Sequence, residues 1–500
     1  MSEGLAKELA NLSQQLLPLI RDNGLSVAFS EIFDGGLCIA DASRNPTSAY
    51  KVRGALASAN EAKISGHDLL VTASAGNHGA GLAYAAQLLG MRARIYVPET
   101  APLVKISKIE GFGATVIKVG KTFDECLAQA RMDGDVSAGK GVFIHPFDDT
   151  TVAAGQGTIG LEILAHAKTV VPGSDFDVVR VFLPIGGGGL VAGVASALRK
   201  SWPESFPKLE IVGVIDESAP ASLVATLFGR PVKVVPDTIA DGTKVAMVGK
   251  TFLAVSRLVD HIMLVPHDQI VAAMRIHESR TVLLSASSEF SKLEGAGALA
   301  LAGEEVAANY QLFGGQSRPL SIAVVSGRNV DSSRYHEVVT EKVRLDPRSH
   351  MRQGFDVVVQ ERPGELLHFL RTVKDYNIAS LTYKQERRTR TGHVRVEFEV
   401  ANGSVEDLER KLAHEFPGSR RLSPGEHMVY KVGDPVAQRY REELIALTDK
   451  PGSFLDCVQG ISLKGALGSV GFLFYRKPAQ AGAAAQVVIG HSQTPLPVIQ

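Results

Sequence analysis

The sequence contains little cysteine and no long apolar segment, and each absence excludes a class of protein. Only three cysteines occur among 500 residues, at Cys38, Cys126 and Cys457. They argue against a disulfide framework, fit a reducing compartment, and form no Cys-x-x-Cys pair of the kind that binds structural zinc. No run of about 18 apolar residues occurs, so we expect no membrane-spanning helix. The amphipathic start of the chain lacks the features of a signal peptide, which predicts a cytoplasmic protein.

The sequence also lacks an excess of charge of either sign. Lys plus Arg number 53 and Asp plus Glu number 53, giving a formal net charge of zero. No overall field would therefore attract nucleic acid or anionic lipid. Hydrophobic residues at 45% and charged residues at 21% are typical of a globular protein with an ample core. The length predicts two to four domains.

Residues 50–330 alternate between short apolar runs and helical stretches rich in alanine and leucine. Examples are HDLLVTAS followed by GNHGAGLAYAAQLLG, and VVRVFLPI followed by LVAGVASALRK. Continuous apolar strands separated by helices predict an α/β fold, in which helices cover both faces of a doubly wound parallel sheet. Such sheets bind ligands at the carboxyl ends of their strands. The unusual residues of this sequence fall at those positions.

The pattern changes after residue 335, and the polar and charged segment EKVRLDPRSHMRQG, residues 341–354, is expected to be a linker. We expect a first domain over residues 1–343, an α+β module over 352–433 and a second, shortened α+β module over 438–495. ERPGELLHFL in the first module resembles TDKPGSFLDCV in the second, which indicates an internal repeat.

Three segments of the first domain carry chemically useful residues. NPTSAYKVRGA, residues 45–55, places Lys51 ahead of an alanine-rich helix, although a lone lysine is usually a surface residue. SAGNHGAG, residues 74–81, lies between a strand and a helix and contains small residues whose N–H groups can converge on an anion. LPIGGGGLVAG, residues 183–193, opens a helix with four glycines, and a phosphate is the natural ligand of such a loop.

A dinucleotide-binding loop is the first alternative for the glycine cluster. Gly186 and Gly188 begin a Gly-x-Gly-x-x-Gly pattern, but Val191 stands at its last position. No acidic residue clearly ends the next strand, as that fold would require. The phosphate-binding interpretation therefore remains the stronger one.

Taken together, these segments resemble the fold-type II pyridoxal-phosphate enzymes, and more narrowly the threonine and serine dehydratases. The resemblance spans residues 45–331 and follows the family's order of motifs. Further segments that agree are VPETAPLVKISKIEGFGATVI, IHPFDDTTVAAGQGTIGLEI, TIADGTKVA, LEGAGALALAG and VVSGRNVD. This resemblance implies a two-lobed catalytic region with the cofactor, pyridoxal 5′-phosphate, between the lobes.

The resemblance assigns a role to each candidate residue. Lys51 would be the catalytic residue and would bind the cofactor covalently through its aldehyde. Asn77 would donate to the 3′-oxygen of the pyridine ring, and Ser326 would face the ring nitrogen. The remaining assignments are Gly186, Gly187, Gly188 and Gly189 around the cofactor phosphate, and Ser74, Gly76, Asn77 and His78 around the substrate carboxylate. His145 to Asp149, Gln156 and Gly242 are expected to shape the site.

These residues suit β-elimination. A serine hydroxyl does not hold the ring nitrogen protonated as a carboxylate would, which disfavours long-lived carbanion chemistry. Once released from the cofactor, Lys51 becomes a free amine that can remove the proton from the substrate Cα. The resemblance therefore implies deamination of L-threonine, and also of L-serine, to a 2-oxo acid and ammonia.

The sequence departs from the family at several positions. CIADASRNPTSAYK replaces the usual segment before the lysine, and Ile215 stands where relatives carry a glutamate, so we expect no metal site there. The family's Gly-Gly-Asn reads Gly327-Arg328-Asn329, and Arg328 could narrow the pocket or bind a second acidic group. Alternatives are therefore elimination or replacement on another small amino acid, and a degenerate amino-acid sensor. Serine racemase is a further alternative, but Ala75 offers no proton donor for the opposite ring face.

The C-terminal modules resemble the ACT-like regulatory halves of biosynthetic threonine dehydratase. FDVVVQERPGELLHFLRTVKDYNIASLTYK carries this resemblance, although the second module looks more like the family's first half. The resemblance implies isoleucine or valine as an effector, a place in isoleucine biosynthesis, and a homo-oligomer, either a dimer or a tetramer. A module that only supports the structure is the alternative.

Overall fold

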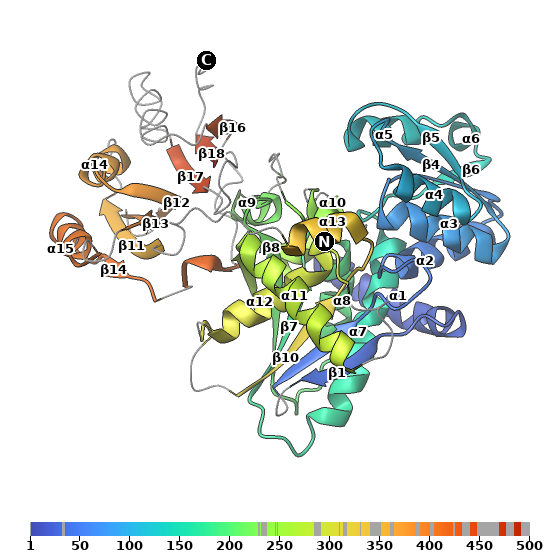
Figure 1. Ribbon diagram of the computed structural model, residues 1–500, viewed down its shortest axis with the longest axis horizontal. Coiled ribbons are helices and arrows are strands. Elements are labelled where there is room, and N and C mark those ends of the chain that lie inside the picture. Colours follow the sequence, from blue (N-terminus) through green and yellow to red (C-terminus); the bar gives the residue numbers. More distant parts are fainter. Residues whose placement is uncertain are drawn as a thin grey trace.

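The computed structural model describes most of the chain (Figure 1). The described residues are 2–32, 36–228, 231, 238–245, 247, 249–284, 292–309, 311–313, 318–330, 332–340, 352–360, 365–386, 391–400, 405–423, 426–432, 441–447, 470–476 and 485–491. Residues 341–351 of the predicted linker, Cys457 and most residues of the ERPGE and TDKPGS turns lie outside these ranges, whereas the last three linker residues begin a strand.

The larger of two parallel sheets forms the base of the catalytic region. Its strand order is β1-β2-β10-β7-β8-β9-β15, and only the edge pairs β1–β2 and β9–β15 are antiparallel. This arrangement is the α/β architecture that the alternating pattern predicts. The strands are β1 (Ala28–Ile32), β2 (Leu37–Asp41), β7 (Val178–Pro184), β8 (Lys208–Asp216), β9 (His261–Val265), β10 (Pro319–Val325) and β15 (Val429–Lys431).

Helices cover both faces of this sheet because its strands are apolar on both sides. Along β7, Val179 and Val181 join a core with α7 and α8, whereas Phe182 joins a second core with α11 and α12. The sheet is therefore doubly wound. The helices of this lobe are α1 (Ser2–Asp22), α7 (Thr150–Val170), α8 (Gly189–Ser201), α9 (Ala221–Phe228), α10 (Gly249–Leu258), α11 (His267–Leu284), α12 (Gly295–Asn309) and α13 (Ser332–Thr340), with the 3-10 turn η1 (Asp241–Thr243).

A smaller lobe is inserted between β2 and β7 and has its own parallel sheet, with the order β5-β4-β3-β6. Figure 1 shows this lobe, in blue and cyan, standing beside the larger one. Its elements are α2 (Val52–Ile64), β3 (Leu69–Ala73), α3 (Asn77–Leu89), β4 (Arg92–Val97), α4 (Leu103–Gly111), β5 (Thr115–Lys118), α5 (Phe123–Arg131), α6 (Gly134–Ser137) and β6 (Gly141–Phe143).

The C-terminal residues form a third sheet with the order β14-β11-β13-β12-β17-β18-β16, and every pairing given for it is antiparallel. Strands of both predicted modules meet in it, because β12 pairs with β17. Its elements, with the turn η4, are β11 (Arg352–Gln360), α14 (Glu365–Thr372), β12 (Asn377–Glu386), β13 (Thr391–Glu399), α15 (Val405–Glu415), β14 (Arg420–Arg421), η4 (Glu426–Met428), β16 (Arg441–Leu447), β17 (Val470–Arg476) and β18 (Ala485–His491).

The short strand β15 departs from the expected division into domains. It lies within the range predicted for the first C-terminal module, yet it pairs with β9 at the edge of the catalytic sheet. An edge strand presents unpaired backbone groups, and β15 covers them on β9. Residues 429–431 therefore complete the catalytic sheet, and the boundaries of the modules stay a prediction.

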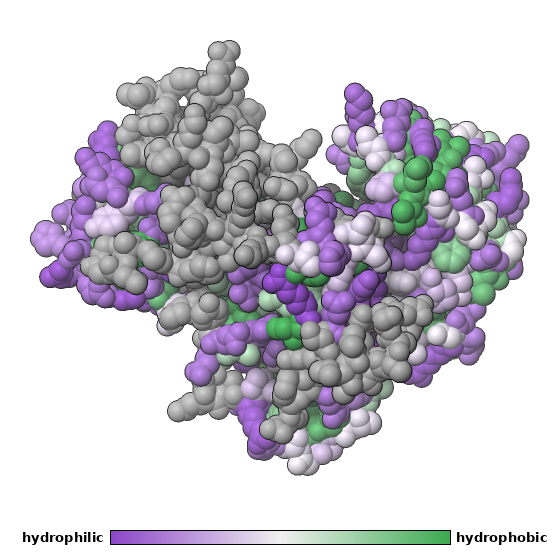
Figure 2. All heavy atoms as spheres, in the orientation of Figure 1, coloured by the Kyte–Doolittle hydropathy of each residue, from purple (hydrophilic) through white to green (hydrophobic). Residues whose placement is uncertain are grey.

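The described surface is mixed in character. Figure 2 shows mainly hydrophilic residues on this face, with hydrophobic ones on the small lobe in the region of α4. The exposed hydrophobic side chains of α4 are Leu103 and Val104. Among the described residues, no helix combines the length and the apolar character needed to cross a membrane.

Candidate active site

One pocket collects residues from the carboxyl ends of strands in both parallel sheets. It contains Lys51, Asn77, the four glycines and Ser326, which lie up to 275 residues apart in the sequence. The strands β10 and β7 end just before Ser326 and the glycines, and β3 ends just before the loop that leads to Asn77. The lining residues are Tyr50, Lys51, Asn77, Phe147, Pro184, Gly186, Gly187, Gly188, Gly189, Leu190, Gly242, Thr243, Glu294, Ala296 and Ser326.

The glycine loop is packed so closely that side chains cannot be added to it. A Cβ on Gly187 would lie 2.4 Å from Cγ of Phe147, and one on Gly186 would lie 2.8 Å from Cα of Thr243. Gly188 has a φ of +83°, a left-handed conformation that glycine adopts without strain. The loop leads directly into α8, so free N–H groups at the start of a 13-residue helix face the pocket.

A second helix, α3, also begins at the pocket. Asn77 is its first residue, and Gly76 precedes it as the N-cap residue. Of the four residues predicted around a substrate carboxylate, Asn77 lines the pocket, and Ser74 and Gly76 are half-buried next to it. His78 is different because its side chain is buried completely. Only its backbone N–H group, at the helix start, is suited to bind an anion.

Ser326 is held against the Lys51 loop by backbone hydrogen bonds. The N–H group of Tyr50 donates to the carbonyl of Ser326 at 3.0 Å. The N–H group of Arg328 donates to the carbonyl of Ser48 at 2.9 Å. The Ser326 hydroxyl is buried and donates to the carbonyl of Ala296 at 3.1 Å. These contacts fix the distance between the lysine loop and the end of β10.

Lys51 has the electrostatic environment of a reactive amine. Burial lowers its pKa to about 8, and the carboxylate of Glu294 opposes this shift. A lysine with a pKa near 8 is partly neutral in mildly alkaline solution, and the neutral amine is the nucleophile and base. The structure therefore gives Lys51 a property that the sequence pattern did not establish.

Glu294 is a site residue that the sequence analysis missed. It lies in the pocket immediately before α12, and the Asn77 amide donates to its Oε1 at 2.7 Å. Burial raises its pKa, while the hydrogen bond from Asn77 acts in the opposite direction. A Cβ on Gly327 would lie only 1.7 Å from Oε1, so glycine at 327 makes room for this carboxyl group. The glutamate of LEGAGALALAG was the available signal.

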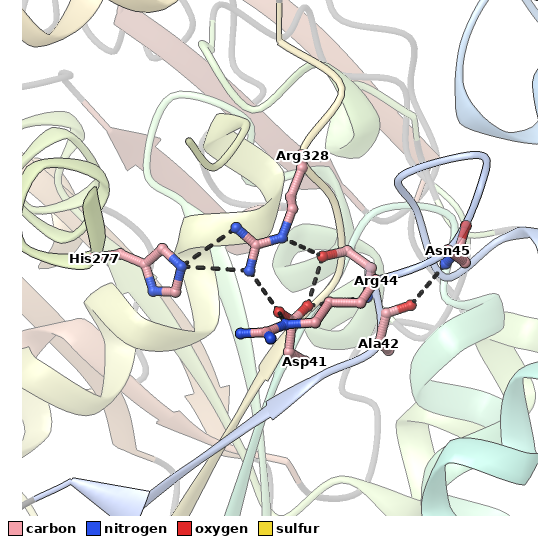
Figure 3. Close-up of polar contacts among 7 residues, drawn as sticks. Asp41, Ala42, Arg44, Asn45, His277 and Arg328 are labelled. Carbon is pink, nitrogen blue, oxygen red and sulfur yellow. Dashed lines mark hydrogen bonds and ion pairs between the residues drawn. The ribbon is translucent and has the colours of Figure 1, made fainter. Parts of the chain in front are cut away.

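Arg328 does not line the pocket, which argues against both roles considered for it from the sequence. Its guanidinium group forms an ion pair with Asp41 at 2.5 Å and donates to the Ser43 hydroxyl at 2.9 Å (Figure 3). Both terminal nitrogens lie 3.4 Å from Nε2 of His277. Burial alone would raise the pKa of Asp41, but Arg328, Ser43 and Arg44 hold it below its usual value.

The remaining residues expected to shape the site are structural neighbours of the pocket. His145 accepts backbone hydrogen bonds at Nδ1, the shorter at 2.9 Å from Asp148, and burial lowers its pKa to about 4. Asp149 caps α7, and Gln156 accepts from the N–H group of Gly54. Within the described ranges, no group of three or more His, Cys, Asp or Glu residues could hold a metal ion.

Comparison with known proteins agrees with this geometry. Residues 17–312 match the family described as pyridoxal-phosphate dependent enzyme. The chain belongs to this family. It is 34% identical over 382 residues to the L-threonine ammonia-lyase of Geobacter sulfurreducens, covering 74% of this chain and 86% of that protein.

Two proteins from Solanum lycopersicum extend the comparison. Identity to threonine dehydratase 2 biosynthetic, chloroplastic is 37% over 63% of this chain, although the match spans only about half (49%) of that protein. The structure of the processed form of threonine deaminase isoform 2 aligns with a TM-score of 0.55 and 32% identity. That alignment covers 66% of this chain and 88% of the solved one.

The pocket fits the family's cofactor, pyridoxal phosphate. The glycine loop and the start of α8 provide N–H groups for a phosphate in a space that side chains would fill. Lys51 can bind an aldehyde covalently, and Asn77 and Ser326 offer hydrogen-bonding groups in the same pocket. The residues predicted to hold the cofactor therefore meet in one place.

Proposed function

We propose that this pyridoxal-phosphate enzyme is a threonine ammonia-lyase, which converts L-threonine to 2-oxobutanoate and ammonia and L-serine to pyruvate and ammonia. The observation that carries the proposal is the pocket in which a lysine of lowered pKa faces a glycine phosphate loop, a helix start and a serine. The names of the relatives support threonine as the substrate.

The start of α3 suits the carboxylate of the substrate. The N–H groups of Asn77 and His78 are the first of a 13-residue helix, so they have no partners within it and carry its positive dipole end. Glu294 lies beside Asn77, and its raised pKa keeps a proton on it at higher pH than on an ordinary carboxyl group.

Lys51 is placed to act as the base. Pyridoxal phosphate, when bound, withdraws electrons from the substrate Cα and so acidifies its proton. The Lys51 amine can take this proton because burial keeps much of it neutral near pH 8. The β-hydroxyl then leaves as water with the proton that Lys51 has taken, which gives the unsaturated amine. Addition of water to this amine yields the 2-oxo acid and ammonia.

Ser326 favours elimination over transamination. A hydroxyl group does not hold a ring nitrogen in its protonated form, whereas a carboxylate would. The carbanion at Cα is therefore short-lived. Elimination of a β-hydroxyl needs no longer-lived carbanion than this. A variant that carries Asp at position 326 is expected to gain transamination at the expense of lyase activity.

A panel of small amino acids tests the proposal. The purified protein, loaded with pyridoxal phosphate, should release 2-oxobutanoate from L-threonine and pyruvate from L-serine, with one ammonia per oxo acid. Preference for a hydroxyaspartate or a diaminopropionate would assign the elimination to another substrate. Visible absorbance of the bound cofactor without release of any oxo acid would identify a sensor instead.

We also propose that the C-terminal sheet regulates the enzyme by binding isoleucine or valine, and that the protein is a homo-oligomer. Arg352, at the start of β11, lies 3.7 Å from Glu217 of the catalytic lobe and within 3.9 Å of Glu397 and Glu399 of the C-terminal sheet. These buried charges connect the two regions. Calorimetry with isoleucine, together with the rate and the sedimentation of the intact protein, tests both points. A ligand that changes neither heat nor rate leaves the modules with a structural role.

A further inference from the structure

A chain of hydrogen bonds crosses from the small lobe to the large lobe beside the pocket. The ammonium group of Lys108, on α4, donates to Oδ1 of Asn329 and, at 3.0 Å, to the carbonyl of Thr47. The Asn329 amide donates to Oδ1 of Asn77 at 2.7 Å and to the carbonyl of Thr47 at 2.7 Å. The Asn77 amide donates in turn to Glu294 at 2.7 Å.

The Lys108 ammonium group and the Thr47 carbonyl together fix the donor and acceptor directions of these hydrogen bonds. An ammonium group can only donate, and a backbone carbonyl can only accept. Asn329 must therefore turn its oxygen to Lys108 and its NH₂ group to Thr47 and Asn77. Asn77 must in turn receive this donor on its oxygen, which leaves its own NH₂ group on the side of Glu294 and the pocket.

We propose that Lys108 and Asn329 are positioning residues that hold the Asn77 amide with its N–H donors toward the cofactor. One N–H of Asn77 is used by Glu294, and the second is available for the ring oxygen. An asparagine that turned over would present its carbonyl oxygen to that acceptor instead. The inference rests on the proposed role of Asn77 and explains what keeps the amide in one orientation.

Lys108 is suited to this task because it forms no salt bridge within the part of the chain that the structure describes. Both of its acceptors are neutral oxygens, and burial lowers its pKa while Glu294 opposes the shift. Lys105, one helical turn earlier on α4, offers a contrast. It is half-exposed, and its ammonium group forms an ion pair with Asp241 at 3.1 Å.

The test uses absorbance of bound pyridoxal phosphate in the full-length enzyme. The ratio of its near-ultraviolet and visible bands responds to the hydrogen bond on the ring oxygen. Lys108→Met removes one of the two groups that orient Asn329, the other being the Thr47 carbonyl. Asn329→Asp can only accept, so it forces Asn77 to turn its NH₂ group away. We expect both variants to change the band ratio and to weaken cofactor binding by roughly tenfold, as the loss of one hydrogen bond would.

Two further variants separate orientation from charge. Lys108→Arg keeps a donor and should restore the band ratio of the parent enzyme. Lys105→Met removes an equal charge from the same helix, together with its contact to the large lobe, and should leave the ratio unchanged. An unchanged ratio and unchanged affinity in Lys108→Met and Asn329→Asp would overturn the inference, as would an equal effect of Lys105→Met. A parent protein without a visible band would instead count against the proposed function.

Discussion

Two helices of equal length begin at the pocket, and they provide its hydrogen-bond donors in different ways. At the start of α8, four glycines leave only backbone N–H groups, and the neighbours Phe147 and Thr243 fill the space that side chains would need. At the start of α3, the side chain of Asn77 takes part, and two further side chains orient it. A phosphate can be held by backbone groups alone, because their direction is fixed by the helix. A side-chain amide has two orientations, so it needs neighbours that select one.

Lys51 lines the same pocket as these two helix starts, and its loss should have the largest effect. Lys51→Ala removes the covalent link and the base together, so we expect turnover to fall by several orders of magnitude. Borohydride reduction followed by peptide mapping should find the cofactor on Lys51 in the parent protein and on no residue of the variant. Trapping on Lys63 or Lys105 would show that the wrong lysine has been assigned.

The comparison predicts unequal tolerance of added side chains at the two helix starts. Gly187→Ala would bring a Cβ to 2.4 Å from the ring of Phe147, so the loop must move and cofactor affinity should be lost almost completely. Gly76→Ala meets no atom within 4 Å and should weaken binding far less. Titration of the two apoproteins with pyridoxal phosphate measures the difference. Equal losses would mean that the two loops do not differ in this way.

Breaking the buried ion pair between Asp41 and Arg328 should be strongly destabilising, because it leaves a buried charge without its partner. Asp41→Asn leaves the guanidinium group of Arg328 without its carboxylate, which should lower the free energy of unfolding by about 3–5 kcal/mol. Asp68→Asn, in the exposed pair with Arg92, is the matched control and should cost about 0–1 kcal/mol. Denaturant unfolding of both apoproteins tests this. Similar losses in the two variants would contradict the assignment.

The lowered pKa of Lys51 predicts how cofactor capture depends on pH. Only the neutral amine attacks the aldehyde, so the rate for the apoprotein should rise with pH and level off above about 8. Below that value the rate should fall about tenfold per pH unit, as the fraction of neutral amine does. Stopped-flow absorbance from about pH 6 to about pH 10 measures this pH profile. A midpoint near 10, as for an exposed lysine, would show that burial does not activate this residue.

The smallest effect concerns stereochemistry at the start of α3. Ala75, which precedes Gly76, has no hydroxyl group that could return a proton to the opposite face of the substrate. We therefore expect D-serine to remain near the limit of detection while L-serine is converted to pyruvate. Chiral chromatography of the products provides the measurement. D-serine formed as fast as pyruvate would identify another proton donor.

The same contrast explains what could be read from the sequence. The glycine loop, its preceding strand and its helix are consecutive in the chain, so their local pattern predicted both the fold and the candidate phosphate site. Glu294 and Asn77 are 217 residues apart, and Lys108 and Asn329 are 221 apart. These side chains meet only once both lobes have folded, so a local motif can mark a single residue such as Asn77 but not the contacts between these residues. Arg328 stands out in the sequence, but the position of its guanidinium group depends on its contacts with Asp41 and His277, which the sequence does not reveal.

The pairing of β15 with β9 has a consequence for synthesis of the protein. Residues 261–265 emerge from the ribosome well before residues 429–431, which complete the edge of their sheet. During that interval, the nascent catalytic region exposes a strand edge of the kind that pairs with other chains. Synthesis of β15 therefore ends the period in which the edge of β9 can pair with other chains, and a chaperone that binds early would protect this edge.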